Sequence, residues 1–427
     1  MHIPLSLHNM KINLKSITFL LISIITCGLA QGLTIIAIPW YFTDQLKLSS
    51  EFSLFYGIIT IIGLFWSLYS GVIIDTFNRK KILLYINCIS ALIFGIIGCC
   101  MHFLNTLHPI FIFSGFATCT FYYIIFFPNL YALAQELTKK KEYVKINSWI
   151  EIFFQTTSIS AAIVCGLLLS GSDVLFDDLN WTIFQFDRWK ISEIFILNSL
   201  LYSITFMLLY FINYDYEKSL NATDIFSTFQ EIKKASHFLI EKKSILIYGI
   251  CSQIIFAFLI VELFCLLPLF VKNCLNENII VFSLADVIYG LGAIVAGFIT
   301  IKILQYIDKV SFTLCLIILT GYSFLVMIKF PEITVFLVTT LIIGLTNASA
   351  RITRMSYFFE EIPNYLMGRT STIFNCINTL IRAILILIFS MNWFSEENHV
   401  IIGYKIGIYI LIIFSIPLIQ LIQSKLN

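Results

Sequence analysis

The chain has 427 residues, of which 59% are hydrophobic and only 12% charged, and its mean hydropathy is +0.91. A soluble globular protein has an apolar fraction near half and about 25% charged residues, so this composition excludes one and indicates a polytopic membrane protein. The net charge of +2 gives no reason to expect a nucleic-acid or acidic partner.

Twelve apolar runs are long enough to cross about 30 Å of hydrocarbon at about 1.5 Å per residue. The first run continues past Gly28, Leu29 and Ala30, a weak cleavage-site pattern, so we expect a retained helix and not a signal peptide. The runs predict an all-α protein with twelve transmembrane helices. Their residues are 17–42, 53–74, 82–103, 110–134, 146–169, 191–212, 245–271, 283–304, 310–328, 333–356, 370–391 and 402–422.

A polar hinge, Gly71 to Lys81, separates the second run from the third. Gly71 permits two helices to approach closely, and Asp75 can face the positive end of another helix. Asn78 tolerates a left-handed turn. The three cations that follow it, ending at Lys81, mark the cytoplasmic side. An ordinary positive-inside loop would also explain these cations.

The distribution of Lys and Arg predicts the orientation. Of the 27 such residues, 18 fall on segments joined to the N-terminal side, 6 on the opposite side and 3 within spans. An excess of cations marks the cytoplasmic loops. We therefore expect both termini in the cytoplasm and the chain in the cell inner (plasma) membrane.

Internal similarity predicts a division into six plus six helices. Ala134-Gln-Glu136-Leu, between the fourth and fifth runs, matches Phe359-Glu-Glu361-Ile, between the tenth and eleventh. We expect an N-terminal bundle at 1–212, a cytoplasmic linker at 213–244 and a C-terminal bundle at 245–427. Apolar residues at helical spacing in the linker predict an amphipathic helix on the inner leaflet.

The hinge resembles the loop between helices 2 and 3 of the major facilitator superfamily. That pattern reads Gly, three residues, Asp, a cation, any residue, Gly, one residue and two cations. Here Thr76 replaces the first cation and Asn78 the second glycine. Together with twelve spans and repeated halves, the resemblance implies the major facilitator fold, two parallel six-helix bundles.

Within that superfamily the chain is most similar to the macrolide and multidrug efflux branch. The similar stretches are Leu33 to Trp40, Gly71 to Leu83, Asn129 to Ser148 and Gly344 to Arg369. The fourth run lacks the arginine that proton-coupled members often carry, and the fifth lacks the Gly-Pro pair of the antiporter motif. Coupling chemistry therefore cannot be carried over from those motifs.

The resemblance implies a cytoplasmic gate in which Asp75 contacts the start of the eleventh helix, around Gly368 to Thr370, in the outward-facing state. Glu151 lies about 8 Å inside the inner boundary and is a gate contact on this interpretation. The expected gate residues are Gly71, Asp75, Arg79, Lys80, Glu136, Glu151, Glu361 and Arg369.

Charged side chains inside the second half are the best candidates for transport chemistry. An ionised side chain at membrane depth costs at least about 2.5 to 3.5 kcal/mol, so each needs a cavity, a partner or the interface. Glu262 and Arg382 lie deepest. We expect Glu262 to be the proton-coupling carboxylate and Arg382 to be part of a substrate site. A fixed ion pair between the two is the alternative. Arg351 and Arg354 share a helix face nearer the cytoplasm, where snorkelling or pairing with Glu360 and Glu361 is as good an explanation.

Amide side chains could bind substrate or join helices by hydrogen bonds. The expected substrate and coupling set is Glu262, Arg382, Arg351, Arg354, Gln31, Asn347 and Asn378. We interpret Asp286 mainly as a carboxylate at a helix start. His102 and His108 do not have metal-ligand spacing, so no metal and no cofactor is expected.

The leading hypothesis is a monomeric secondary transporter that exports a small anionic or zwitterionic metabolite, with protons as coupling ion. Arginine offers bidentate donors to carboxylates, and a carboxylate siderophore is the sharpest version. Efflux of hydrophobic drugs or macrolides is the second hypothesis, favoured by 41 Phe and 20 Tyr. A membrane-embedded enzyme is the third, but no reactive His with a nearby acid and no paired Asp share one span.

Overall fold

The computed structural model describes residues 14–104, 108–138, 143–171, 187–214, 225–396 and 399–426. These residues include twelve helices long and apolar enough to cross a membrane, so the predicted all-α, twelve-span fold class is confirmed. Many large apolar side chains point outward, such as Phe65, Phe103 and Phe298. A soluble protein rarely exposes so much apolar surface, and a lipid environment explains it.

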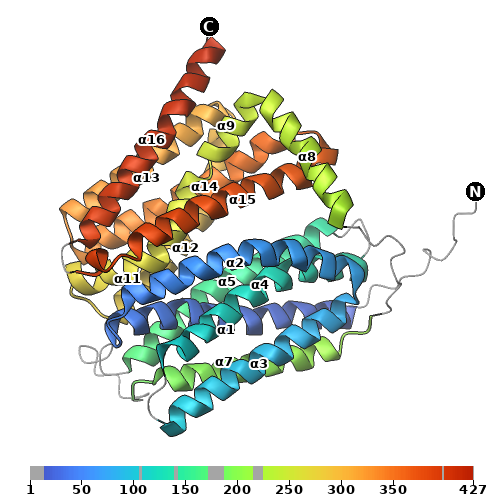
Figure 1. Ribbon diagram of the computed structural model, residues 1–427, viewed down its shortest axis with the longest axis vertical. Coiled ribbons are helices and arrows are strands. Elements are labelled where there is room, and N and C mark those ends of the chain that lie inside the picture. Colours follow the sequence, from blue (N-terminus) through green and yellow to red (C-terminus); the bar gives the residue numbers. More distant parts are fainter. Residues whose placement is uncertain are drawn as a thin grey trace, which may run out of the picture. The chain divides into compact units, whose positions relative to one another are not determined.

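The chain forms two compact units (Figure 1). The first comprises Met1–Ile38 and Phe65–Thr223, and the second Pro39–Leu64 and Asp224–Asn427. The first helix, α1 (Leu14–Asp44), and the second, α2 (Ser49–Thr76), therefore contribute to both units.

The first unit contains most of α1, the end of α2, α3 (Arg79–Leu104), α4 (Pro109–Leu137), α5 (Tyr143–Ser170) and α7 (Ile191–Tyr210). Stacked rings of Phe94 and Tyr202, 5.5 Å apart, join α3 to α7. Asn198 donates to Thr34 Oγ1 (2.9 Å), which joins α7 to α1. Polar groups between membrane helices need such partners because lipid supplies none.

In the second unit the seventh span consists of short segments. They are α9 (Lys243–Cys251), α10 (Ile254–Val261), the π-helix η3 (Glu262–Leu266), α11 (Leu267–Leu269) and the π-helix η4 (Phe270–Cys274). Pro268 lies between the π-helices and lacks the amide donor that a regular helix needs. Such irregular segments often occur at functional sites.

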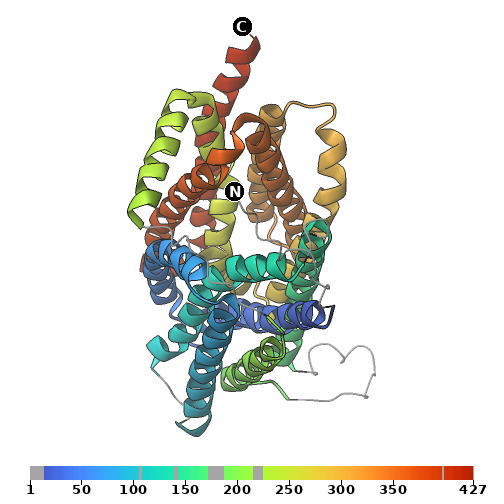
Figure 2. The same cartoon turned by 90° about the vertical axis from the view of Figure 1, so that its right-hand side faces the viewer.

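The other helices of the second unit surround this span. They are α12 (Ile279–Ile303), α13 (Lys309–Lys329), α14 (Ile333–Glu361), α15 (Asn364–Phe389), the short 3₁₀ helix η5 (Asn392–Ser395) and α16 (Val400–Leu426). Thr320 donates to Thr346 (2.8 Å), joining α13 to α14. Figure 2 shows α16 extending beyond the neighbouring helices of its unit at the C-terminus. The helix α8 (Ile225–Glu241) lies in the predicted linker and packs against α15 and α9.

Helices α12 and α14 approach each other closely at two glycines. A Cβ atom on Gly344 would overlap the backbone oxygen of Tyr289, and one on Gly292 would overlap that of Leu341. Only glycine permits this backbone contact. At Gly71, where the hinge predicted a close approach, a Cβ would meet no described atom within 4 Å.

Asn78 also differs from expectation. It does not have the positive φ of a left-handed turn, which among the described non-glycine residues occurs at Lys47 and Asn276. Its side-chain oxygen instead accepts a hydrogen bond from the backbone amide of Lys81 (3.0 Å), at the start of α3. Asn is a favoured capping residue because it satisfies an amide that the first turn leaves free.

Candidate functional site

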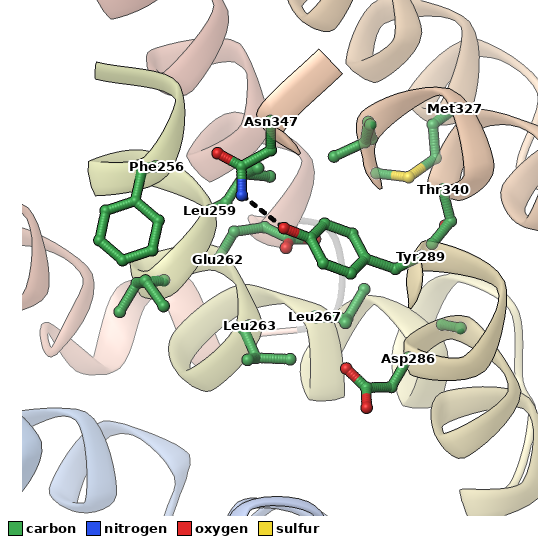
Figure 3. Close-up of a pocket in the computed structure, with 13 residues that line it drawn as sticks. Phe256, Leu259, Glu262, Leu263, Leu267, Asp286, Tyr289, Met327, Thr340 and Asn347 are labelled. Carbon is green, nitrogen blue, oxygen red and sulfur yellow. Dashed lines mark hydrogen bonds between the residues drawn. The ribbon is translucent and has the colours of Figure 1, made fainter. Parts of the chain in front are cut away.

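A cavity of about 130 Å³ lies within the second unit, between α10, η3, α11, α12, α13 and α14 (Figure 3). This volume is many times the 10 to 15 Å³ or so that one water requires. Five of its lining residues carry polar groups and eight are apolar. The lining residues are Phe256, Leu259, Ile260, Glu262, Leu263, Leu267, Ala285, Asp286, Tyr289, Met327, Thr340, Ile343 and Asn347.

Glu262 is buried at the first position of η3. Its Oε1 accepts a hydrogen bond from the hydroxyl of Tyr404 on α16 (2.7 Å). A hydrogen bond to a charged group contributes about 1.5 to 3 kcal/mol. The bond therefore fixes the carboxyl group but leaves its other oxygen available to the cavity.

Tyr289 links the polar groups of the cavity. Its hydroxyl accepts a hydrogen bond from the side-chain amide of Asn347 (Figure 3). The backbone contact at Gly344 brings these two side chains together, because Asn347 lies one turn after that glycine on α14.

The cavity contains two carboxyl groups without a cationic partner. Among the described residues, neither Glu262 nor Asp286 forms an ion pair. The nearest cation on the same helix as Asn347 is Arg351, one turn later, whose side chain is exposed. The cavity can therefore accept hydrogen-bond donors, protons or a positive group, whereas Arg351 does not line it.

Sequence reasoning missed Asp286, Tyr289 and Tyr404. The interpretation of Asp286 as a helix-start carboxylate is wrong, because α12 begins at Ile279, two turns earlier. The signal for that start is Asn278, whose side chain accepts from the Ile280 amide (2.9 Å). The sequence contains no comparable signal for the two tyrosines, since their role depends on which helices meet.

Arg382 does not reach Glu262. It donates to Thr379 Oγ1 (3.1 Å) on its own helix, and its buried Nε has no hydrogen-bond partner in the described part of the chain. The ion pair between Glu262 and Arg382 that the sequence allowed is not formed.

The other substrate candidates lie at different places. Arg354 donates to the backbone carbonyl of Ser252 (3.0 Å), and buried Asn378 donates to that of Gln253 (3.3 Å). Neither residue lines the cavity. Gln31 is half-buried on α1 in the first unit. Glu360 forms an ion pair with Lys309 and not with an arginine of α14.

Three of the expected gate residues come together at the ends of α3 and α4 in the first unit. Arg79 forms an ion pair with Glu136 (2.7 Å) and donates to the carbonyl of Ala132 (2.9 Å). Lys80 donates to the carbonyls of Tyr210 (2.8 Å) and Ile212 (2.7 Å). These bonds tie α3 to the ends of α4 and α7.

The remaining gate candidates lie elsewhere in the chain. Gly71 is exposed, and Glu361 is the exposed last residue of α14. Arg369 is half-buried on α15. The side chains of Asp75 and Glu151 lie outside the described residues.

A sequence profile of the Major Facilitator Superfamily matches residues 20–386, most of the chain. The chain belongs to the major facilitator superfamily. It is accordingly a secondary transporter and not an enzyme, and a multi-pass membrane protein. No curated protein sequence matches it at a significant level.

Solved structures support the fold of this transporter. A mutant of the nucleoside transporter NupG is 12% identical, with a TM-score of 0.74 over 95% of this chain and 99% of that one. A bacterial metal transporter is 12% identical, with a TM-score of 0.68 over 95% and 98%. A D-xylose–proton symporter is 15% identical, with a TM-score of 0.64 over 96% and 97%. Identities this low establish the fold and not the substrate.

Proposed function

We propose that this transporter exports a small organic metabolite that carries a carboxylate, by alternating access driven by protons. The observation that carries the proposal is the cavity of the second unit, where buried Glu262 forms no ion pair with any residue that the structure describes. Superfamily members carry small molecules and are often proton-coupled. The cavity supplies both a space for the solute and a group that can exchange a proton.

Glu262 is the coupling residue in this proposal. Ionisation at membrane depth costs about 2.5 to 3.5 kcal/mol or more when no cation compensates it. The Tyr404 hydroxyl offsets part of that cost by its hydrogen bond. The carboxyl group therefore takes up a proton after substrate has left the outward-open cavity, and releases it into the cytoplasm before new substrate binds the inward-open cavity.

The charged groups in and near the cavity favour a zwitterionic substrate. Arg351, one turn along α14 from the cavity residue Asn347, offers two parallel donors to a carboxylate, while Asp286 and Glu262 offer acceptors to an ammonium group. A purely anionic solute would face the two carboxyl groups without compensation unless both carried protons. A carboxylate siderophore with amine or amide groups is the sharpest form of this hypothesis.

Efflux of a hydrophobic drug is the second candidate. Eight of the 13 lining residues are apolar, including Phe256 and Met327. Aromatic and Met side chains adapt to varied apolar ligands. An apolar cation would use the same carboxyl groups and would not require Arg351.

The proposed architecture follows the sequence repeat. Residues 1–212 and 245–427 would rock as two bundles around the substrate, joined by the linker at 213–244. Both termini lie in the cytoplasm in this arrangement, because 18 of 27 cations fall on that side. The transporter acts as a monomer in the inner membrane, and Arg79 and Glu136 belong to its cytoplasmic gate.

A flux assay in proteoliposomes tests the proposal. Purified protein is reconstituted, and net uptake down a substrate gradient is measured with radiolabelled citrate, with radiolabelled glutamine and with fluorescent ethidium. We expect glutamine, the zwitterionic probe, to move with an opposing proton flux that internal pyranine reports. Movement of ethidium alone would favour drug efflux, and movement of a probe without proton flux would refute the coupling.

A further inference from the structure

The seventh span is interrupted between α9, which ends at Cys251, and α10, which begins at Ile254. The backbone amide of Gln253 bonds to the carbonyl of Ile250 (3.2 Å), one residue nearer than in an α-helix. The hydroxyl of Ser252 donates to the carbonyl of Gly249 (3.3 Å). Ser252 and Gln253 therefore form a tight junction between two separate helical segments.

Side chains from two other helices bind this junction. The Arg354 guanidinium, from α14, donates to the carbonyl of Ser252 (3.0 Å). The Asn378 amide, from α15, donates to the carbonyl of Gln253 (3.3 Å), which also accepts the regular bond from the Ala257 amide (2.9 Å). Carbonyls at an interrupted helix need such donors because lipid offers none.

The two segments are anchored by different contacts. On α9, the hydroxyl of Tyr248 is hydrogen-bonded to that of Thr313 on α13 (3.0 Å). On α10, the ring of Phe258 packs against Phe324 and Phe389, with ring centres 5.4 and 6.4 Å apart. Because each segment has its own anchor, their relative direction is decided at the junction.

Two helices, α10 and α14, connect the junction to the cavity. Glu262 follows Gln253 by nine residues, and α10 is the helix between them. Arg354 follows Asn347 by seven residues on α14, a rise of about 10.5 Å. A change in α14 at the cavity therefore reaches the junction through a rigid helix.

We propose that Arg354 and Asn378 are positioning residues that clamp the junction of α9 and α10 and so fix the direction of the segment that carries Glu262. They act on the backbone of the seventh span and not on the substrate. The consequence for transport rests on the proposed function, in which Glu262 carries the proton. The clamp itself rests only on the hydrogen bonds described above.

Hydrogen exchange of the full-length purified protein tests the clamp directly. Arg354→Gln and Asn378→Leu remove the donors at nearly constant volume, and Arg354→Lys keeps one charged donor. Met355→Ala and Leu380→Ala are matched controls, since both side chains are exposed neighbours on the same helices. We expect amides of residues 252–260 to exchange at least tenfold faster in the first two variants, with Arg354→Lys intermediate and the controls unchanged.

Counterflow of the probe that wild type carries gives the second measurement. A clamp predicts that kcat falls at least fivefold in Arg354→Gln and Asn378→Leu while KM stays within twofold, and that Arg354→Lys recovers part of kcat. A tenfold rise in KM with unchanged exchange would make both residues substrate ligands and overturn the proposal. Unchanged amide exchange at residues 252–260 would also overturn it. The same holds if amide exchange becomes faster in α13 to the same degree as at the junction. If wild type moves no probe, the proposed function fails, and exchange alone decides on the clamp.

Discussion

Replacing Glu262 by Gln should separate substrate exchange from proton coupling. Glutamine keeps the size of the side chain, and its carbonyl oxygen can still accept the hydrogen bond from Tyr404. It cannot carry a proton in exchange for substrate. We therefore expect the variant to fold, to bind substrate and to lose accumulation driven by a proton gradient.

The magnitude follows from the number of carboxyl groups in the cavity. One pH unit corresponds to 1.36 kcal/mol per proton, so one proton at a gradient of about two units supports a roughly hundredfold gradient of a neutral zwitterion. Protons on both Glu262 and Asp286 would support roughly ten-thousandfold. Glu262→Gln should reduce the accumulation ratio of substrate to about one if Glu262 carries the only proton, and to about a hundred if Asp286 carries a second one.

The assay uses proteoliposomes with an imposed pH difference and no membrane potential, followed to the steady-state ratio of labelled substrate. Counterflow without a pH difference should stay within twofold of wild type. Glu332→Gln is the control, because Glu332 is an exposed carboxylate before α14 and outside the cavity. An unchanged accumulation ratio in Glu262→Gln would show that coupling lies elsewhere, and the whole argument from its burial would then be wrong.

Substitutions at three further positions have defined outcomes. Asp75→Asn should bias the transporter toward the inward-facing state and slow counterflow at matched expression, and a wild-type rate would remove the gating role. Arg382→Lys keeps the charge but loses the planar fork, so a carboxylate substrate should bind more weakly in a binding assay, whereas unaltered transport in Arg382→Gln would make the residue structural. Gly344→Ala should lower stability by about 1 to 3 kcal/mol, because the new methyl group overlaps the backbone of Tyr289. Thermal unfolding measures that loss of stability. Displacement of Tyr289 in Gly344→Ala should also weaken substrate binding. Ala348→Gly, on the same helix, is the comparison and should leave substrate binding unchanged.

The sequence alone determined the twelve spans and the fold class, because a membrane span is a property of apolar length that each segment carries by itself. It also indicated Glu262 and Asn347, which line the cavity, since polar groups at membrane depth need a reason to be there. The hinge allowed the family to be recognised before any contact was known.

Only the tertiary structure decided which partners these side chains have. Asp286 joins the cavity because α12 starts two turns before it, and Tyr404 reaches Glu262 from the last helix of the chain. Arg354 and Asn378 bind backbone carbonyls at the point where the seventh span is interrupted. Apolar length can be read along one segment, whereas a hydrogen bond between helices depends on how each helix is rotated and how closely two backbones approach. That approach is set at Gly292 and Gly344, which lie on different helices and far apart in the chain.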